Sequence, residues 1–540
     1  MAGQRDVRAL VASLPAWQRL ALAAALTVAV GAAVAVSVRE LGSDEEAAAR
    51  LATPGATTTA PAPTGPPTTG APANPTTTTA AVTTTTEPPA PTTTVPPFEG
   101  LVDPTSSGRP WGDTVEGLLT FRGNPTRTYY GEGPVPRDPR IAWTREIGCS
   151  TSSVGGEARV WCGSGWTGQP AVWERDGRTW LAFGAYDRNV HFLDADTGED
   201  ILPPFPTGDI IKGSVTVDPD GFPLVYTGSR DGRYRVIAFD GDAPRVLWDL
   251  PANAVRPTLW NNDWDGAGLV VDDFLIIGGE NSQLHVVKLN RSIGADGLVA
   301  VAPELAWNTP GWDPELLHDL GDSNVSIESS VAWHDGTVWF TNSGGLVQGW
   351  HIGSPPMSAY PTRVFRFWVG DDTDATVVVG DEGDLYVAAE WDRGTARAAE
   401  IGQLVRLDPD TPGDPLVWAV KDQDPDDPAG FWATPALHRD LVIAPTTSGR
   451  LLGIDRATGA IRWEKELFGP VWQSPVIVDD VLLQGDCNGT MHAYDVRDTR
   501  VEPAELWSVH ITGCIESTPA VWAGRIHVGT RSGLMVTLSD

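Results

Sequence analysis

The chain has 540 residues, of which 70 are acidic and 38 are basic, so its formal charge at pH 7 is -32. This charge argues against a nucleic-acid partner, because binding to phosphates requires a basic surface. Anionic lipids and anionic wall polymers are disfavoured for the same reason. The length is sufficient for several domains or for one large array of repeats.

The N-terminal segment predicts attachment to a membrane. Leu20 to Val38 is a run of 19 residues without a charge, and a helix of that length just spans a hydrocarbon layer of about 30 Å. Arginines precede the run, so the positive-inside rule places residues 1–19 in the cytoplasm and the rest of the chain outside. We therefore expect a single-pass protein of the cell membrane. A cleaved signal peptide is the alternative, because Ala33 to Ala35 fits a cleavage pattern, but the apolar run is longer than usual for one.

Residues 39–98 predict a disordered stalk. From Leu51 to Pro97 the chain is mostly Thr, Pro and Ala, with Glu87 as its only charge, so it has too little apolar side chain to offset the entropy of ordering. Partial polyproline geometry at about 3 Å per residue would carry the following domain on the order of 100 Å from the membrane. Such tracts are candidates for O-glycosylation, and the composition fits a passive spacer equally well.

A repeated unit follows the stalk. Its clearest copy, Leu451 to Glu466, reads as a strand, a turn made by Arg456 to Gly459, and a second strand that carries Trp463. Asp, Asn and Gly supply the side-chain hydrogen bond and the positive φ that such turns need. Aromatic residues recur at the Trp463 position every 43 to 62 residues, which predicts four-stranded propeller blades, some with inserted loops. The candidates are Trp143, Phe205, Trp248, Trp307, Trp368, Trp418, Trp463 and Trp507.

The last repeat predicts how the blades form a ring. After Thr518 the chain forms only three strands before it stops at Asp540, and the orphan strand Arg140 to Glu146 supplies the missing fourth. We therefore expect residues 140–540 to be an all-β, eight-bladed β-propeller of four-stranded antiparallel blades, closed by this N-terminal strand and free of exposed sheet edges. Residues 99–139 would be an N-terminal extension packed on a monomeric propeller with little helix.

The repeats resemble the PQQ-like repeats of eight-bladed propellers of the quinoprotein dehydrogenase type. The pattern is Thr/Ser-Pro-Ala-Val, then Gly-x-x-x-Gly, then Leu-x-x-Ile/Leu-Asp-x-x-Thr-Gly-x-x-x-Trp, and residues 434–463 match it best. This family includes quinone-dependent enzymes and also the propeller lipoprotein of the outer-membrane β-barrel assembly machine, so the resemblance implies a fold more than an activity. Phe121 to Gly131, "FRGNPTRTYYG", is similar to the leader ahead of such propellers, and we interpret it as a peripheral brace. A composition rich in Arg, Ala, Gly, Val and Asp suggests a GC-rich, actinobacterial source.

The resemblance implies that an enzyme of this family would carry two adjacent cysteines joined against the quinone, and a Ca²⁺ held by Glu, Asn and Asp. No two cysteines of this chain are adjacent. An even number of cysteines in an exported domain favours structural disulfides, and we pair Cys149 with Cys162 and Cys487 with Cys514 from their places in the repeats. Zinc is the competing use, but no CxxC or HxxxH accompanies them. We expect no cofactor; PQQ and calcium belong to the dehydrogenase alternative.

Histidines and acidic runs give no catalytic or metal assignment. His191, His285 and His492 occupy one equivalent place in their repeats, which favours strand packing over chemistry. The run Gly370 to Asp384 offers clustered carboxylates to a hard cation, but it lacks the ordered D-x-D-x-D-G spacing and the distal Glu. We interpret it as a solvated connection between blades. No residue is therefore assigned as catalytic, cofactor-binding or metal-ligating.

One set of residues lies where the fourth strand of a blade leads into the innermost strand of the next. These connections gather at the mouth of the central channel, where aromatic planes and carboxylates suit flat or sugar-like ligands or apolar peptide segments. The alternative is that the tryptophans wedge adjacent blades together. The candidate ligand rim consists of Trp166, Trp260, Asp263, Trp264, Glu328, Trp432, Trp472 and Glu516.

Two functions follow from different classes. The first, which we prefer, is a membrane-tethered extracytoplasmic scaffold that binds an envelope protein or a cell-wall component without catalysis. The second is a PQQ-dependent alcohol or sugar dehydrogenase, which the lack of adjacent cysteines and of a visible Ca²⁺ triad disfavours, since function must be argued from the site. A sensor that signals inward through residues 1–19 is a third hypothesis. It has little support, because that tail carries no recognisable motif.

Overall fold

The computed structural model describes residues 108–154, 157–166, 168–380, 382–411, 413–422 and 429–540. The chain divides into two units, Met1–Pro96 with Ser153–Arg159 and Pro97–Ser152 with Val160–Asp540, and the second unit holds the blades. The expected membrane helix at 20–38 and stalk at 39–98 lie outside the described residues. Among the residues that are described, no helix combines the length and the apolar character that crossing a membrane requires.

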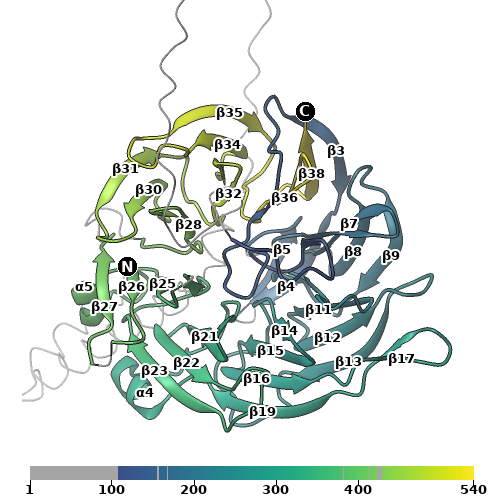
Figure 1. Ribbon diagram of the computed structural model, residues 1–540, viewed down its shortest axis with the longest axis horizontal. Helices are drawn as coiled ribbons and strands as arrows, with labels where there is room; N and C mark the ends of the chain where they lie inside the picture. Colours follow the sequence, from purple (N-terminus) through teal and green to yellow (C-terminus); the bar gives the residue numbers. More distant parts are fainter. Residues whose placement is uncertain (1–107, 155–156, 167, 381, 412, 423–428) are drawn as a thin grey trace, which may run out of the picture. The chain divides into compact units, whose positions relative to one another are not determined.

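The second unit is a propeller in which eight sheets, each built on four antiparallel strands, surround a common centre (Figure 1). In each blade the strands run from an innermost strand A to an outermost strand D, whose side chains are the most exposed. Blades 1 to 4 consist, from A to D, of β6 (Ala171–Arg175), β7 (Arg178–Gly184), β8 (Asn189–Asp194) and β9 (Asp200–Pro206); β10 (Thr216–Val217), β11 (Leu224–Ser229), β12 (Arg233–Ala238) and β13 (Arg245–Pro251); β14 (Leu269–Val271), β15 (Phe274–Gly279), β16 (Gln283–Lys288) and β19 (Glu304–Pro310); and β20 (Ala332–His334), β21 (Thr337–Phe340), β22 (Leu346–His351) and β23 (Thr362–Trp368).

The second half of the ring repeats this order. Blades 5 to 8 consist, from A to D, of β24 (Val378–Val379), β25 (Leu385–Ala388), β26 (Leu404–Leu407) and β27 (Leu416–Val420); β28 (Ala436–His438), β29 (Leu441–Pro445), β30 (Arg450–Asp455) and β31 (Ile461–Glu466); β32 (Val476–Val478), β33 (Val481–Gly485), β34 (Thr490–Asp495) and β35 (Ala504–His510); and β36 (Ala520–Trp522), β37 (Arg525–Thr530), β38 (Leu534–Ser539) and β3 (Arg140–Glu146).

Short elements decorate the connections between these strands. The hairpin β4 (Cys149–Val154) and β5 (Glu157–Cys162) precedes blade 1, and the hairpin β17 (Ser292–Ile293) and β18 (Val299–Ala300) is inserted in blade 3. The helix α4 (Pro314–Leu320) leads into blade 4, and α5 (Ala396–Ile401) lies within blade 5. α4 begins where Asp313 caps it, since the Asp313 side chain accepts a hydrogen bond from the Leu316 N–H, and proline occupies the first turn.

The ring closes as the sequence predicts. β3 pairs antiparallel with β38, which places Trp143 opposite Thr537 in the sheet that also contains Val521 and Val528. Apolar side chains of blades 8 and 1 then share one buried cluster, including Met535 and Leu181. The chain's last three strands are thereby completed by a strand from its beginning, and the predicted eight-bladed, four-stranded architecture is confirmed.

The recurrent tryptophan of strand D packs on the turn of the next blade. Trp143 donates from its indole N–H to the carbonyl of Ala195 at 3.0 Å. A Cβ on Gly198, which has a φ of +74°, would lie 2.6 Å from the same ring, so this glycine is required by both its backbone and its neighbour. Trp418 lies against Gly459 in the same way. The Asp-x-x-x-Gly turn and the tryptophan are therefore two halves of one contact between blades.

The prediction that Phe205 and Trp368 occupy the Trp463 position is wrong. The Trp463 position lies opposite the fourth residue of strand C, and in blades 1 and 4 that position holds Leu202 and Phe365. Phe205 and Trp368 lie three residues further along their strands and pair elsewhere. A search for aromatic residues misses Leu202, and it passes over Phe365 because a tryptophan follows on the same strand.

The segment Phe121 to Gly131 lies inside the ring, so its interpretation as a peripheral brace is wrong. It is framed by β1 (Gly117–Leu118), which pairs with β6, and β2 (Gly131–Glu132), which pairs with β36. Between them, backbone carbonyls of the segment accept hydrogen bonds from N–H groups of other inner strands, among them Trp333 to Pro125 at 2.8 Å. On the channel side, the backbone N–H and C=O groups of the inner strands have no neighbouring strand of their own blade. The segment forms hydrogen bonds with these groups.

Two arginines of this segment bond to blades on opposite parts of the ring. Arg122 donates to the carbonyl of Pro435 at 2.7 Å and to that of Pro475 at 3.0 Å. Arg127 donates to the carbonyl of Val331 and, at 3.1 Å, to that of Ala267. With the backbone bonds of Leu119 and Thr126 to blades 2 and 5, residues 117–132 bond to all eight blades. We call these residues the leader plug.

Candidate functional site

The connections from strand D to strand A and the hairpins from B to C meet on one face of the ring. There the N–H of Glu280 donates to the carbonyl of Asp263, and the N–H of Glu390 to that of Asp372. The fourth residue before each strand A occupies an equivalent place around the channel, and that of blade 1 lies outside the described residues. We call this set the mouth ring; its described members are Lys212, Asp265, Glu328, Asp374, Trp432, Trp472 and Glu516.

One side of the mouth is filled by an aromatic cluster of Trp166, Trp432 and Trp472. The Trp166 and Trp432 ring centroids lie 5.6 Å apart, and those of Trp432 and Trp472 lie 5.1 Å apart and nearly perpendicular. All three rings are buried. Trp166 precedes blade 1 and Trp432 precedes blade 6, which are not neighbours in the ring, so their rings meet over the channel.

The opposite side of the mouth carries a blade 3 triad of buried carboxylates, Asp263, Asp265 and Glu280, whose oxygens lie within 4.8 Å of one another. The Lys212 ammonium is seated among them, 2.5 Å from Asp265 and 3.5 Å from each of the other two. Arg230 adds a second cation 3.4 Å from Asp263. Two positive charges therefore face three carboxyl groups.

Burial governs the protonation of this triad. Loss of hydration and the charge of Asp265 together raise the pKa of Asp263 to about 7, although Lys212 and Arg230 act to lower it. Burial and the nearby charge of Glu328 also raise the pKa of Glu280 well above its usual value. The cations therefore do not fully compensate for desolvation of the carboxylates.

A second triad, Asp372, Asp374 and Glu390, occupies the same places in blade 5, again with oxygens within 4.8 Å of one another. Asp374 accepts a hydrogen bond from the indole N–H of Trp432 at 3.1 Å. Burial raises the pKa of Asp372 and Glu390 well above their usual values. The half-buried Glu328 lies between the two triads, and its charge raises the pKa of Asp372 as well as that of Glu280.

The interpretation of Gly370 to Asp384 as a solvated connection is therefore wrong for its first half. Asp371, Asp372 and Asp374 are all buried. The reason is positional: the first part of the run leads directly into β24, which lies within the run, and the B-to-C connection of the same blade closes over this part, as the bond from the Glu390 N–H to the Asp372 carbonyl shows.

The remaining rim candidates lie in different surroundings. Trp264 does not reach the mouth; it packs between Tyr234 and His285, with centroids at 5.6 and 5.3 Å, and so acts as a wedge between blades 2 and 3. Trp260 is 56 % exposed on the connection into blade 3. Glu516 is buried and accepts a hydrogen bond from Arg531 at 3.0 Å.

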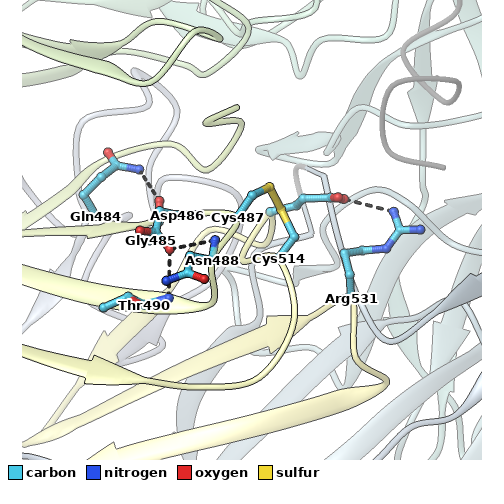
Figure 2. Close-up of a disulfide and its surroundings, with 9 residues drawn as sticks. Gln484, Gly485, Asp486, Cys487, Asn488, Thr490, Cys514 and Arg531 are labelled. Atoms are coloured by element: carbon cyan, nitrogen blue, oxygen red, sulfur yellow. Dashed lines mark hydrogen bonds and ion pairs between the residues drawn. A yellow bond between two sulfur atoms is a disulfide. The ribbon is translucent and has the colours of Figure 1, made fainter. Parts of the chain in front are cut away.

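The structure joins the cysteines in the two expected pairs, and both disulfides lie on the mouth face. Cys487 in the B-to-C hairpin of blade 7 is bonded to Cys514 in the connection into blade 8, so this disulfide links two blades (Figure 2). The neighbouring Asp486 side chain shapes the hairpin by accepting from the N–H groups of Asn488 and Thr490 (Figure 2). Cys149 and Cys162 join the ends of the β4–β5 hairpin.

The three equivalent histidines are engaged within their own blades. His191 lies 3.0 Å from Asp187 and stacks on Phe183. His285 is fully buried, and burial lowers its pKa to about 4. His492 lies between Asp486 and Glu505. These contacts agree with strand packing.

The sequence analysis missed Lys212, Asp265, Glu280, Asp374 and Glu390 as residues of the mouth. A signal was present, because an Asp-x-Asp pair precedes strand A in both blade 3 and blade 5, and a glutamate follows in the next B-to-C hairpin of each. The pairs "DWD" and "DTD" become visible as a repeat only once the strands have been aligned.

Comparison with known proteins gives a partial family match and several solved structures of similar fold. Residues 365–539, less than half of the chain, match the family model described as outer membrane protein assembly factor BamB. No curated protein matches the chain significantly. Quinohemoprotein alcohol dehydrogenase from Comamonas testosteroni is similar at 13% identity with a TM-score of 0.51, covering 78% of this chain and 80% of its own.

Two further structures are similar at comparable levels. The computationally designed Ika8 protein has 13% identity and a TM-score of 0.50, covering 70% of this chain and 96% of its own. BamB from Moraxella catarrhalis has 15% identity and a TM-score of 0.49, covering 75% of this chain and 100% of its own. At these identities a structural likeness shows the fold alone. Together with the repeats, the match over residues 365–539 and the closed ring show an eight-bladed β-propeller of PQQ-like repeats that is similar to the BamB family model.

Proposed function

We propose that this protein is an extracytoplasmic binding or assembly scaffold, tethered to the cell membrane through residues 20–38, that recruits an envelope protein or a cell-wall component without catalysis. Two disulfides in the propeller support an oxidising compartment outside the cytoplasm. Family members serve both as assembly factors and as enzymes, so the choice depends on the site.

The observation that carries this proposal is that the protein's own residues fill the centre of the ring. The leader plug bonds to the inner strands of all blades, and Trp166 and Trp432 meet over the channel at its mouth. A flat cofactor seated on the axis would have to displace these rings. The residues present therefore do not fit PQQ, and neither disulfide joins the adjacent cysteines that the dehydrogenase resemblance implies.

One feature favours the dehydrogenase alternative. Asp374 lies beside Trp432, which brings a carboxylate and an aromatic plane together at the mouth. Burial also raises the pKa of the neighbouring Asp372 and Glu390 carboxyls well above their usual values, and carboxyl groups with raised pKa values are candidates for acid–base chemistry. An equivalent set of carboxylates in blade 3 is paired with Lys212, however, which supports a structural use of those acidic residues.

The mouth face carries two isolated apolar anchors for a partner. Trp260 is 56 % exposed on the connection into blade 3, and Phe468 is 60 % exposed on the connection into blade 7. Exposed aromatic side chains of this kind dominate protein interfaces. We propose that the mouth face is directed toward the partner.

A capture experiment with the full chain tests this role. Replacing Trp260 and Phe468 with alanine should reduce recovery of the partner crosslinked in cells by about tenfold or more, because hot-spot aromatics each contribute about 2 kcal/mol or more. The matched control is Tyr360→Ala, since Tyr360 is 94 % exposed but lies in a C-to-D loop on the other face. Equal loss in both variants, or no loss in the double variant, would contradict a partner site at the mouth.

A further inference from the structure

We propose that the blade 5 triad, Asp372, Asp374 and Glu390, is a binding site for one Ca²⁺ ion. The three side chains are buried and bring their oxygens within 4.8 Å of one another. This inference is independent of the proposed function, because the site requires neither a quinone nor a protein partner.

The strongest support is the comparison of blade 5 with blade 3 of the same chain. In blade 3 an equivalent set of carboxylates surrounds the ammonium of Lys212, which belongs to the mouth ring of the preceding blade. In blade 5 the corresponding member of the mouth ring is Glu328. Ser343 takes the hairpin position that Arg230 holds ahead of blade 3. Blade 5 therefore has an equivalent group of carboxylate oxygens, but the carboxylate of Glu328 takes the position that the Lys212 ammonium holds beside blade 3.

The unsatisfied oxygens of the blade 5 triad provide independent support. Among the described residues, Glu390 Oε1 and Asp372 Oδ1 have no hydrogen-bond partner, and these side chains belong to residues that are only 8 % and 9 % exposed. A buried carboxylate oxygen without a partner is costly, by roughly several kcal/mol for a charged group. A cation seated among the three carboxylates removes that cost.

The neighbouring charges do not supply this cation. Arg393 is the basic residue whose charge acts on Asp372, but its guanidinium is held by Asp322 at 2.8 Å and by the carbonyls of Asn324 and Ser343 at 3.0 Å. The groups outside the triad that otherwise act on Asp372 and Glu390 are Asp371, Asp392 and Glu328, which are all acidic. Arg393 therefore leaves the local charge strongly negative.

The donor set selects the class of ion. All three ligands are carboxylates, so the site offers hard oxygen donors without nitrogen or sulfur. Ca²⁺ takes six to eight such oxygens in a flexible geometry completed by water, whereas Mg²⁺ demands near-ideal octahedral geometry and keeps most of its water. A cage built from two residues of a loop and one of a hairpin suits Ca²⁺ better.

Titration of the purified full chain, freed of metal with a chelator, tests the site. We expect one Ca²⁺ per chain by calorimetry, and Tb³⁺ luminescence excited through tryptophan, because Trp432 lies 3.1 Å from Asp374. Asp372→Asn and Glu390→Gln together should weaken Ca²⁺ binding by about tenfold or more. The equivalent pair Asp263→Asn and Glu280→Gln in blade 3 is the matched control and should leave affinity within about twofold, since Lys212 serves that triad.

A second variant tests the same claim without removing a ligand of the triad. Glu328→Lys places an ammonium where blade 5 lacks the counterpart of Lys212. It should abolish Ca²⁺ binding and the rise in melting temperature that Ca²⁺ causes, and should raise the melting temperature of the metal-free protein. The site is refuted if the wild-type chain binds no stoichiometric Ca²⁺, if it binds Mg²⁺ in preference, or if Glu328→Lys and the blade 5 pair bind Ca²⁺ as the wild type does.

Discussion

Replacing Arg127 with methionine should lower the free energy of unfolding of the propeller by about 3 to 5 kcal/mol. Arg127 is fully buried at the centre of the ring, and burial lowers its pKa to about 9, so it remains charged at neutral pH. Its guanidinium donates to the carbonyls of Val331, Ala267 and Phe121. Methionine fills similar volume but leaves these acceptors buried and unsatisfied. The midpoint of chemical denaturation measures the effect.

The matched control is Arg145→Met on the outermost strand of blade 8. Arg145 pairs with Asp200 at 2.7 Å, but both side chains are about one-third exposed, so solvent screens the pair and the change should be about 1 kcal/mol or less. A loss of stability at Arg127 no greater than at Arg145 would show that the leader plug is not a structural centre of the ring. Arg122→Met, which frees the carbonyls of Pro435 and Pro475, should behave like Arg127→Met.

Replacing Lys212 with methionine should destabilise the protein by about 3 to 5 kcal/mol at pH 8, because removing one partner leaves buried charges uncompensated. The carboxyls of the blade 3 triad have raised pKa values in the folded state, that of Asp263 being about 7. Such groups contribute stability that is fully present below the unfolded-state pKa of about 4 and is lost as pH rises through the folded-state pKa. Loss of Lys212 raises these pKa values further, so the deficit should shrink markedly at pH 5.

The pH dependence distinguishes this effect from a packing defect. Burial lowers the pKa of His285 to about 4 and that of His527 to about 3. Both therefore reduce stability as pH falls below about 6.5, but they do so in the wild type and the variant alike and cancel in the difference. Lys288→Met is the control, since Lys288 is exposed at the end of β16. A deficit of equal size at pH 5 and pH 8 would contradict the electrostatic account.

The fold could be predicted because its signals are local and repeated. The turn and tryptophan of each blade recur together because they form one contact, as Trp143 and Gly198 show. The closing strand could be found by counting, since the last blade lacks its fourth strand and Arg140 to Glu146 had no other partner. Both cysteine pairs follow from positions within the repeat.

The centre of the ring could not be predicted in the same way. The bonds of Arg122 span more than 300 residues of sequence and go to backbone carbonyls, which leave no side-chain pattern. The acidic triads were hidden because an acidic run looks like solvated loop until the start of strand A is known. Trp264 was placed at the rim because sequence position alone does not show that its ring turns inward between Tyr234 and His285.

Titration of the full chain with PQQ in the presence of Ca²⁺ tests most directly the claim that the filled centre of this propeller makes it a scaffold. The account predicts no stoichiometric quinone absorbance and no reduction of an artificial dye when alcohols or sugars are added, because the Trp166 and Trp432 rings meet over the channel. Binding of one PQQ per chain with alcohol-dependent or sugar-dependent dye reduction would contradict the account and establish the dehydrogenase.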